Sequence, residues 1–219
     1  MVCCRIGKTI LASAVIEAAS KQHDSKVAFV YCKDENPNRN NFLSIARNLL
    51  YQLSHNNDRL VEYIDAIMSK EGQMKLQKMD LVQELLRVII RCYNSVFIVI
   101  DGFNECYMQD KKTIFQWVQS IISSSGPMPQ GGKQSSSGQG EDGEPALVRC
   151  LIVGQEDGDT SRLLRGYPVL KILPGDNTAD IITYCEAWES KIRTKFPSVK
   201  FDDFPNSISN QVLKCADGE

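Results

Sequence analysis

The stretch that decides the fold is Ser-Val-Phe-Ile-Val-Ile-Asp, residues 95–101, in which five apolar residues run directly into a carboxylate. A continuous run of β-branched and aromatic residues predicts a strand that is buried on both faces of a sheet. Asp101 would then lie at the carboxyl end of the strand, where open α/β sheets bind ligands. Gly102 follows, and because Asp-Gly is also common turn chemistry, a strand that simply meets solvent is the alternative.

Two further apolar runs flank this stretch, at residues 26–32 (KVAFVYC) and 146–154 (ALVRCLIVG). We predict that Val27–Cys32, Val96–Asp101 and Leu147–Val153 are parallel strands of one sheet, with a weaker strand at Val169–Leu173. Apolar residues at helical spacing predict helices that begin near Gly7, Asn41, Arg59, Leu81, Lys111, Thr178 and Ser207. Strands that alternate with helices indicate an α/β fold with a mainly parallel sheet covered on both faces.

One segment differs from the rest in composition. Residues 126–143 (GPMPQGGKQSSSGQGEDG) offer only Met128 as an apolar anchor. Such a composition cannot bury enough apolar surface to offset the entropy of ordering the chain. We therefore expect a disordered insert that can be deleted between a helix and the third predicted strand.

The second motif is Gly7-Lys8-Thr9 at the start of the first predicted helix. In a complete phosphate-binding loop, GxxxxGK[ST], backbone amides surround the phosphates, the lysine reaches the β- and γ-phosphates, and the hydroxyl binds Mg²⁺. That spacing requires glycine at position 2, where this chain has Val2. A chance tripeptide at a helix start is the alternative, and Asp101 downstream in the expected order argues against it.

Charge and cysteine content exclude several classes of function. The formal net charge is -2 with lysine and arginine spread along the chain, which is not the pattern of a nucleic-acid-binding protein. The eight cysteines form no CxxC pair and there are only two histidines, so we expect no zinc site. We also expect no membrane span and no secretory signal, and hence a reduced cytoplasmic protein.

Taken together, five stretches resemble the NACHT-type NTPase domain of fungal STAND proteins, the large incompatibility-type signalling receptors of NLR-like, innate-immunity type. They begin at Gly7, Val27, Val96, Leu147 and Val169 (GKTILASAVIEA, VAFVYCKDENPNRNNFLSIARNLLYQL, VFIVIDGFNEC, LVRCLIVGQEDGDTSRLLRG and VLKILPGDNTADIITYCEAW). The resemblance spans the chain except for residues 126–143. It implies a P-loop NTPase-type three-layer α/β sandwich that binds ATP or GTP with Mg²⁺.

The resemblance also implies roles for single residues. Gly7, Lys8 and Thr9 correspond to the Walker A motif, and Asp101 corresponds to the Walker B aspartate, so that Thr9 and Asp101 hold Mg²⁺. Glu105 corresponds to the catalytic acid that follows, and Gln155 aligns with the position of a sensor arginine in many relatives. Asn104 replaces an acid in the usual Asp-Gly-Leu-Asp-Glu pattern.

By the same resemblance, residues 1–200 form a partial NACHT domain and residues 201–219 begin the following helical segment. The first strand of that domain and the glycine-rich half of its loop would precede Met1, so we expect a fragment whose first strand is missing. We accordingly expect weak binding of ATP or GTP and no useful hydrolysis by this chain.

Three hypotheses about function follow. The first is the nucleotide-binding switch module of a STAND signalling NTPase, which self-associates through the full-length protein. The second is a degenerate interaction fragment that no longer binds nucleotide, which Val2 and Asn104 favour. The third is a small-molecule kinase, but the insert at residues 126–143 lacks the arginine-rich lid that such an enzyme needs.

Overall fold

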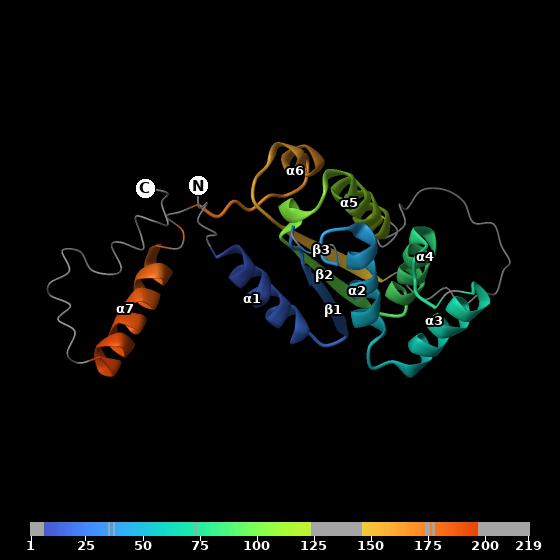
Figure 1. The fold of residues 1–219 in the computed structure, drawn as a ribbon, viewed down its shortest axis with the longest axis horizontal. Helices are drawn as coiled ribbons and strands as arrows, with labels where there is room; N and C mark the ends of the chain where they lie inside the picture. Colours follow the sequence, from blue (N-terminus) through green and yellow to red (C-terminus); the bar gives the residue numbers. More distant parts are fainter. Residues whose placement is uncertain are drawn as a thin grey trace, which may run out of the picture. The chain divides into compact units, whose positions relative to one another are not determined.

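The computed structural model describes residues 7–34, 36, 38–72, 74–123, 146–173, 176 and 178–196. The chain divides into two compact units, Thr9–Gly166 and a second one made of Met1–Lys8 with Tyr167–Glu219. The larger unit contains the sheet and most of the helices (Figure 1). In the second unit the structure describes helix α7, Thr178–Lys195.

The sheet has three parallel strands in the order β1-β2-β3. The strands are β1 (Ser25–Tyr31), β2 (Ser95–Asp101) and β3 (Leu147–Val153), as the sequence predicts. Tyr31, Asp101 and Val153 lie side by side in the register. The three segments that follow the strands therefore begin at the same edge of the sheet.

In the part of the chain that the structure describes, five helices precede or connect the strands of this unit. Helix α1 (Lys8–Ser20) precedes β1, and α2 (Phe42–Ser54), α3 (Asp58–Lys70) and α4 (Met79–Ile90) lie between β1 and β2. Helix α5 (Met108–Ser123) follows β2. Asparagine side chains start two of these helices, because Asn41 accepts a hydrogen bond from the Ser44 amide and Asn57 accepts one from the Leu60 amide.

One face of the sheet carries the main hydrophobic core. Helices α2, α4 and α5 cover it, and Val96, Ile98 and Ile100 of β2 point into it. The helices contribute side chains that are almost completely buried, namely Phe42, Leu49, Leu53, Leu85, Leu86, Ile89, Ile114 and Ile121. The spacing of these residues along each helix is the periodicity that predicts the helices from sequence.

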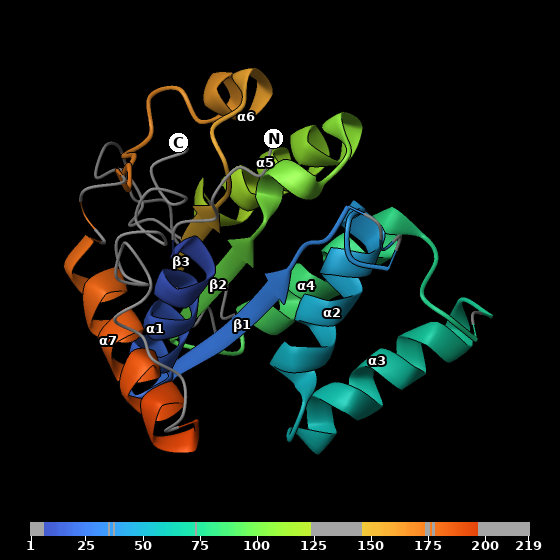
Figure 2. The same ribbon diagram turned by 60° about the vertical axis from the view of Figure 1, so that its left-hand side comes forward.

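The opposite face is covered by α1, as Figures 1 and 2 show. Its buried cluster consists of Ala12, Val99 and Val153, with Ile16, Phe29 and Leu151 packed against it. Val99 alternates with Ile98 and Ile100 along β2, so it points to this face. Helix α1 therefore rests on the sheet through a small apolar contact, and its Ile10 is 76% exposed.

The outer edge of β1 is covered by a side chain instead of a strand. The Gln52 amide donates a hydrogen bond to the Phe29 carbonyl (2.6 Å), and its oxygen accepts one from the Phe29 amide (3.0 Å). This pairing satisfies backbone groups that an edge strand otherwise exposes to other chains.

Two expectations from sequence are wrong, and others lie outside the described residues. Residues 168–173 form no strand: Val169 and Leu170 are 61% and 81% exposed, and the Leu173 amide and carbonyl are hydrogen-bonded to Asp176 and not to a strand. The polar stretch after β3, whose composition (QEDGDTSR, residues 155–162) favours a loop, instead contains a short helix, α6 (Gly158–Leu163). The insert at residues 126–143 and the segment at residues 201–219 fall outside the description.

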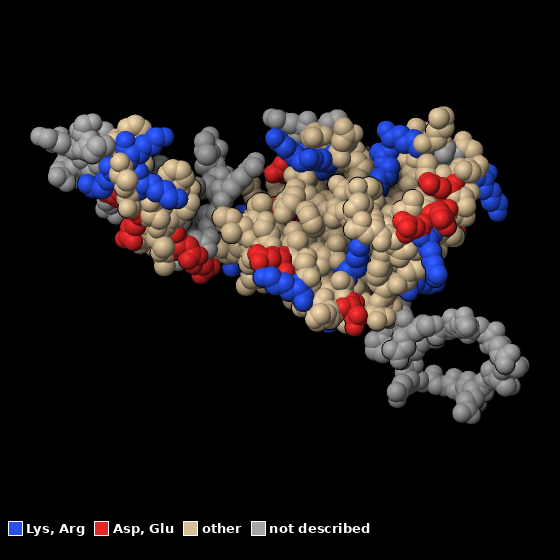
Figure 3. Space-filling model, turned by 90° about the horizontal axis from the view of Figure 1, so that it is seen from below, with Lys and Arg blue, Asp and Glu red and all other residues tan. Residues whose placement is uncertain are grey.

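The structure shows how the charged residues and the cysteines of the described part of the chain are distributed. Acidic and basic side chains are interspersed on the face seen in Figure 3. Among the described residues no helix is long and apolar enough to cross a membrane. Cys32, Cys92, Cys106, Cys150 and Cys185 are free thiols.

Candidate functional site

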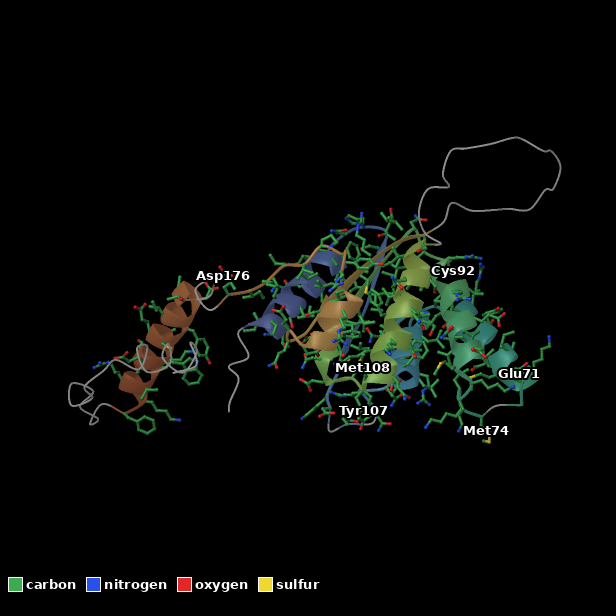
Figure 4. The ribbon with its side chains drawn as sticks, turned by 90° about the horizontal axis from the view of Figure 1, so that it is seen from above. Glu71, Met74, Cys92, Tyr107, Met108 and Asp176 are labelled. Carbon is green, nitrogen blue, oxygen red and sulfur yellow. The ribbon has the colours of Figure 1, made fainter. Side chains whose placement is uncertain are left out.

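The candidate site lies at the edge of the sheet where the strands end. Figure 4 labels a residue from each end of the sheet: Tyr107 follows the carboxyl end of β2, and Cys92 comes shortly before its amino end. Because the strands are parallel and in register, the segments after β1, β2 and β3 meet at the Tyr107 end. An open pocket lined by Lys26, Gln52 and His55, with a volume of about 310 Å³, lies at the opposite end of β1 and is separate from this site.

Thr9 and Asp101 are in direct contact, although 92 residues separate them in sequence. The Thr9 hydroxyl donates a hydrogen bond of 2.7 Å to Oδ2 of Asp101. Asp101 is only 6% exposed, and it alternates with Ile100 along β2, so its side chain points to the α1 face. The first turn of α1 is thereby joined to the carboxyl end of the central strand.

Gly7 and Lys8 directly precede Thr9 in the chain. Gly7 has a positive φ of 55°, and Lys8 is the first residue of α1. Both belong to the second compact unit, so the closeness of Lys8 to Asp101 that the Walker A and Walker B assignments imply stays a prediction.

Gly102 is required where it stands. Its φ is +73°, in the left-handed region that favours glycine. A β-carbon at this position would lie 2.8 Å from the carbonyl oxygen of Cys32. The Asp-Gly pair therefore allows the chain to turn immediately after β2 while β1 and β2 stay close, and the Cys32 amide still donates to the Asp101 carbonyl (2.8 Å).

Glu105 lies in the short 3-10 helix η1 (Phe103–Glu105) that follows this turn. Its Oε2 accepts a hydrogen bond of 3.2 Å from the Asp34 amide, in the segment after β1. The expected catalytic acid is thus close in sequence to Asp101, and it is hydrogen-bonded to the neighbouring loop.

Gln155 is held by the residue that departs from the family pattern. The Gln155 amide donates a hydrogen bond of 2.8 Å to Oδ1 of Asn104. Gly154 allows this approach, because a β-carbon there would lie 3.0 Å from the same oxygen. The structure therefore brings Gln155 to the segment that carries Glu105, although through its backbone.

A partly buried ion pair, which no sequence pattern predicted, lies beside this contact. Lys111 in the first turn of α5 is 6% exposed, and its Nζ is 3.0 Å from Oδ2 of Asp157. Burial alone would raise the pKa of Asp157, but hydrogen bonds from Thr160 and Lys111 outweigh that and lower the pKa below its ordinary value. The available signal was a lysine in the apolar stripe that continues through Ile114 and Phe115.

Two buried thiols lie under the site. The pKa of Cys32 is raised well above its ordinary value, first by a hydrogen bond with Cys106, then by burial, with the carboxylates of Asp101 and Glu105 adding to the effect. A thiol that stays protonated is unreactive, so Cys32 acts as apolar packing beneath the carboxylates.

Two oxygen-bearing side chains at this edge are of the kind that Mg²⁺ binds. Thr9 and Asp101 offer a hydroxyl and a carboxylate, the oxygen ligands that Mg²⁺ prefers. Mg²⁺ is commonly bound by one or two such groups together with phosphate oxygens and water. Among the described residues, no group of three or more His, Cys, Asp and Glu side chains could hold a metal ion.

Comparison with known proteins identifies a family for most of the chain. Residues 5–129 match the family described as nephrocystin 3, N-terminal. The match includes Thr9, Asp101 and Glu105, and it ends before β3 and Gln155. It is not a match to the NACHT family, so the resemblance to NACHT domains is not tested by it.

Comparisons with curated proteins and with solved structures find no match. The family match covers more than half of the 219 residues, from the start of α1 through α5. The chain therefore belongs to the nephrocystin 3 N-terminal family.

Proposed function

We propose that this chain is the nucleotide-binding switch module of a NACHT-type STAND signalling NTPase. Its ligand is ATP or GTP with Mg²⁺, bound at the carboxyl edge of the sheet. The observation that carries the proposal is the hydrogen bond from Thr9 to Asp101. In P-loop NTPases a hydroxyl at the start of a helix and an aspartate at the end of a strand hold the same Mg²⁺.

The surrounding residues support the same assignment. Gly7 and Lys8 precede Thr9 at the start of α1, where free backbone amides and the helix dipole favour a phosphate. Thr9 and Asp101 would hold the metal ion, which supplies charge neutralisation at the phosphates when bound. Glu105, four residues after Asp101, would orient the attacking water. Gln155 would sense the γ-phosphate from the loop after β3.

A second candidate is an interaction fragment that has lost nucleotide binding. Asn104 favours it, because an amide stands where the related pattern has an acid, and its oxygen already accepts a hydrogen bond from Gln155. An amide cannot accept a proton from water at neutral pH, so hydrolysis would rest on Glu105 alone. Both candidates assume a cytoplasmic protein that self-associates through its full-length form.

Titration of the full chain with fluorescent ATP and GTP analogues, with and without Mg²⁺, separates the two candidates. Because Val2 stands in place of a loop glycine, we expect weak binding that requires Mg²⁺. Thr9→Ala and Asp101→Asn should each lower the affinity about tenfold or more, about 1.4 kcal/mol. Lys8→Ala tests the phosphate contact in the same assay.

Thr113→Ala is the matched control, because the Thr113 hydroxyl donates within α5 to the Gln109 carbonyl. Its affinity should equal that of the wild type. Binding that is equal in the Thr9, Asp101 and Thr113 variants would contradict the proposed site. No Mg²⁺-dependent binding to the wild-type chain would favour the interaction fragment.

A further inference from the structure

The loop after β3 is fastened at two points to the segment after β2. The first point is the hydrogen bond of 2.8 Å from the Gln155 amide to Asn104. Gly154 leaves room for this contact, since the Asn104 oxygen and the Asn104 amide nitrogen would lie 3.0 and 3.2 Å from a β-carbon there. Asn104 itself lies between Phe103, which is fully buried, and Glu105.

The second point is the ion pair between Lys111 and Asp157. The Lys111 side chain is 8% exposed and that of Asp157 is 34% exposed, so the pair is shielded mainly on the lysine side. Asp157 also starts α6, because its Oδ1 accepts a hydrogen bond of 2.5 Å from the Thr160 amide. The pair therefore fixes the far end of the loop, two residues beyond Gln155.

The same segment after β2 also holds the segment after β1. Glu105 accepts from the Asp34 amide, and Asp110 accepts a hydrogen bond of 2.7 Å from the Phe42 amide at the start of α2. Residues 104–111 thus contact both neighbouring loops through four side chains. A displacement of Glu105 in this short segment would be passed to Asn104, its neighbour in the chain, and from there to Gln155.

We propose that Asn104 is a positioning residue that couples the state of the nucleotide site to the loop after β3. Asn104 sets the place of Gln155 through the Gln155 amide, and nucleotide bound at Thr9 and Asp101 restrains that loop through Asn104. The inference rests on the proposed function and deepens it. It explains why an amide serves at this position: the oxygen is needed as an acceptor, and no negative charge is needed for the contact.

Backbone hydrogen exchange at residues 154–157, measured on the full chain, tests the coupling. In the wild type, saturation with Mg²⁺ and a non-hydrolysable ATP or GTP analogue should slow exchange in this loop. Asn104→Ala should remove that slowing and should speed exchange without nucleotide about tenfold, because a protecting hydrogen bond is lost. The nucleotide affinity of Asn104→Ala should change less than about threefold, because the proposal gives Asn104 no contact with the nucleotide. A tenfold change would correspond to a loss of about 1.4 kcal/mol of binding free energy.

Two further variants separate coupling from a general loss of structure. Asn104→Asp keeps the acceptor oxygen and should restore the nucleotide-dependent slowing. Asn94→Ala, an exposed asparagine just before β2, should behave as the wild type. Lys111→Met releases the other end of the loop, so exchange should rise near Asp157 while the Gln155 amide stays protected.

The outcomes distinguish this inference from the proposed function. A nucleotide response in Asn104→Ala equal to that of the wild type would overturn the coupling while nucleotide binding stands. Absence of nucleotide binding to the wild-type chain would overturn the proposed function and the coupling with it. In that case the nucleotide-free comparison still shows whether Asn104 protects the Gln155 amide, and unchanged exchange in Asn104→Ala would remove the tether as well.

Discussion

The two faces of the sheet differ in how they are covered. On the face of α2, α4 and α5, many large apolar side chains are fully buried, whereas under α1 the buried cluster comprises Ala12, Val99 and Val153. Strand β2 contributes an equally buried valine to each face, because Val96 is 0% exposed on one face and Val99 is 1% exposed on the other. The two faces thus differ in the number and size of the apolar side chains that surround these valines.

This difference indicates how the two faces divide their roles. Buried apolar area is the main source of folding free energy, so the face of α2, α4 and α5 stabilises the fold. Helix α1 buries little and is fastened at its first turn by the contact between Thr9 and Asp101. A helix held in this way can respond to a ligand at that turn at a low cost to the remaining structure.

The largest expected effect comes from the same substitution on each face. Val96→Ala should lower the free energy of unfolding by roughly 3 kcal/mol, about half from the lost transfer free energy and the rest from a cavity that close packing keeps open. Val99→Ala should cost roughly 1.5 kcal/mol, because α1 can settle into the space. Urea denaturation of the two variants measures the difference, and equal losses would contradict the contrast between the faces.

A smaller effect is expected at the turn that follows β2. Gly102→Ala places a β-carbon 2.8 Å from the Cys32 carbonyl oxygen, in addition to the strain of a positive φ. Gly166 also has a positive φ but has open space around it, so Gly166→Ala isolates the backbone strain. We expect Gly102→Ala to cost roughly 1–2 kcal/mol more than Gly166→Ala in thermal or urea unfolding. Similar costs for the two variants would contradict this expectation, because they would show that the Cys32 carbonyl can move away from the added β-carbon.

The smallest expected effect concerns the ion pair of Lys111 and Asp157. Because the pKa of Asp157 is lowered in the folded protein, its contribution is present above the unfolded pKa, near 4, and is lost as the pH falls through the folded pKa. Since a third of the Asp157 side chain is exposed, we expect Asp157→Asn to cost about 1 kcal/mol at pH 7. The difference from the wild type should shrink as the pH falls below 4 in urea denaturation, and a difference independent of pH would contradict this role.

Much of the fold could be predicted from the sequence. The parallel sheet and its three strands follow from continuous apolar runs, and the helix positions follow from apolar spacing. The contact of Thr9 with Asp101 was expected, because the Walker A and Walker B assignments that the resemblance implies place both residues on one Mg²⁺. The expected strand at residues 169–173 failed because hydrophobicity alone does not supply a pairing partner.

The side-chain contacts that join the loops after β2 and β3 could not be predicted. Asn104 bonds to a backbone amide 51 residues away, and a backbone partner leaves no signature in the sequence. Helix α6 begins with Asp157 as its N-cap but has few apolar residues, so its periodicity was not visible. The sequence showed Asn104 as a departure from a pattern, and only the contact with Gln155 shows what the side chain does.

The central claim, that Thr9 and Asp101 hold the metal of a bound nucleotide, is tested most directly by metal-directed cleavage. Fe²⁺ replaces Mg²⁺ in the presence of ATP or GTP, and ascorbate with peroxide then cuts the backbone near the metal. We predict nucleotide-dependent cuts next to Thr9 and within residues 101–105, which disappear in Asp101→Asn. Cuts that persist in that variant, or that map instead to the pocket around Lys26 and His55, would contradict the account.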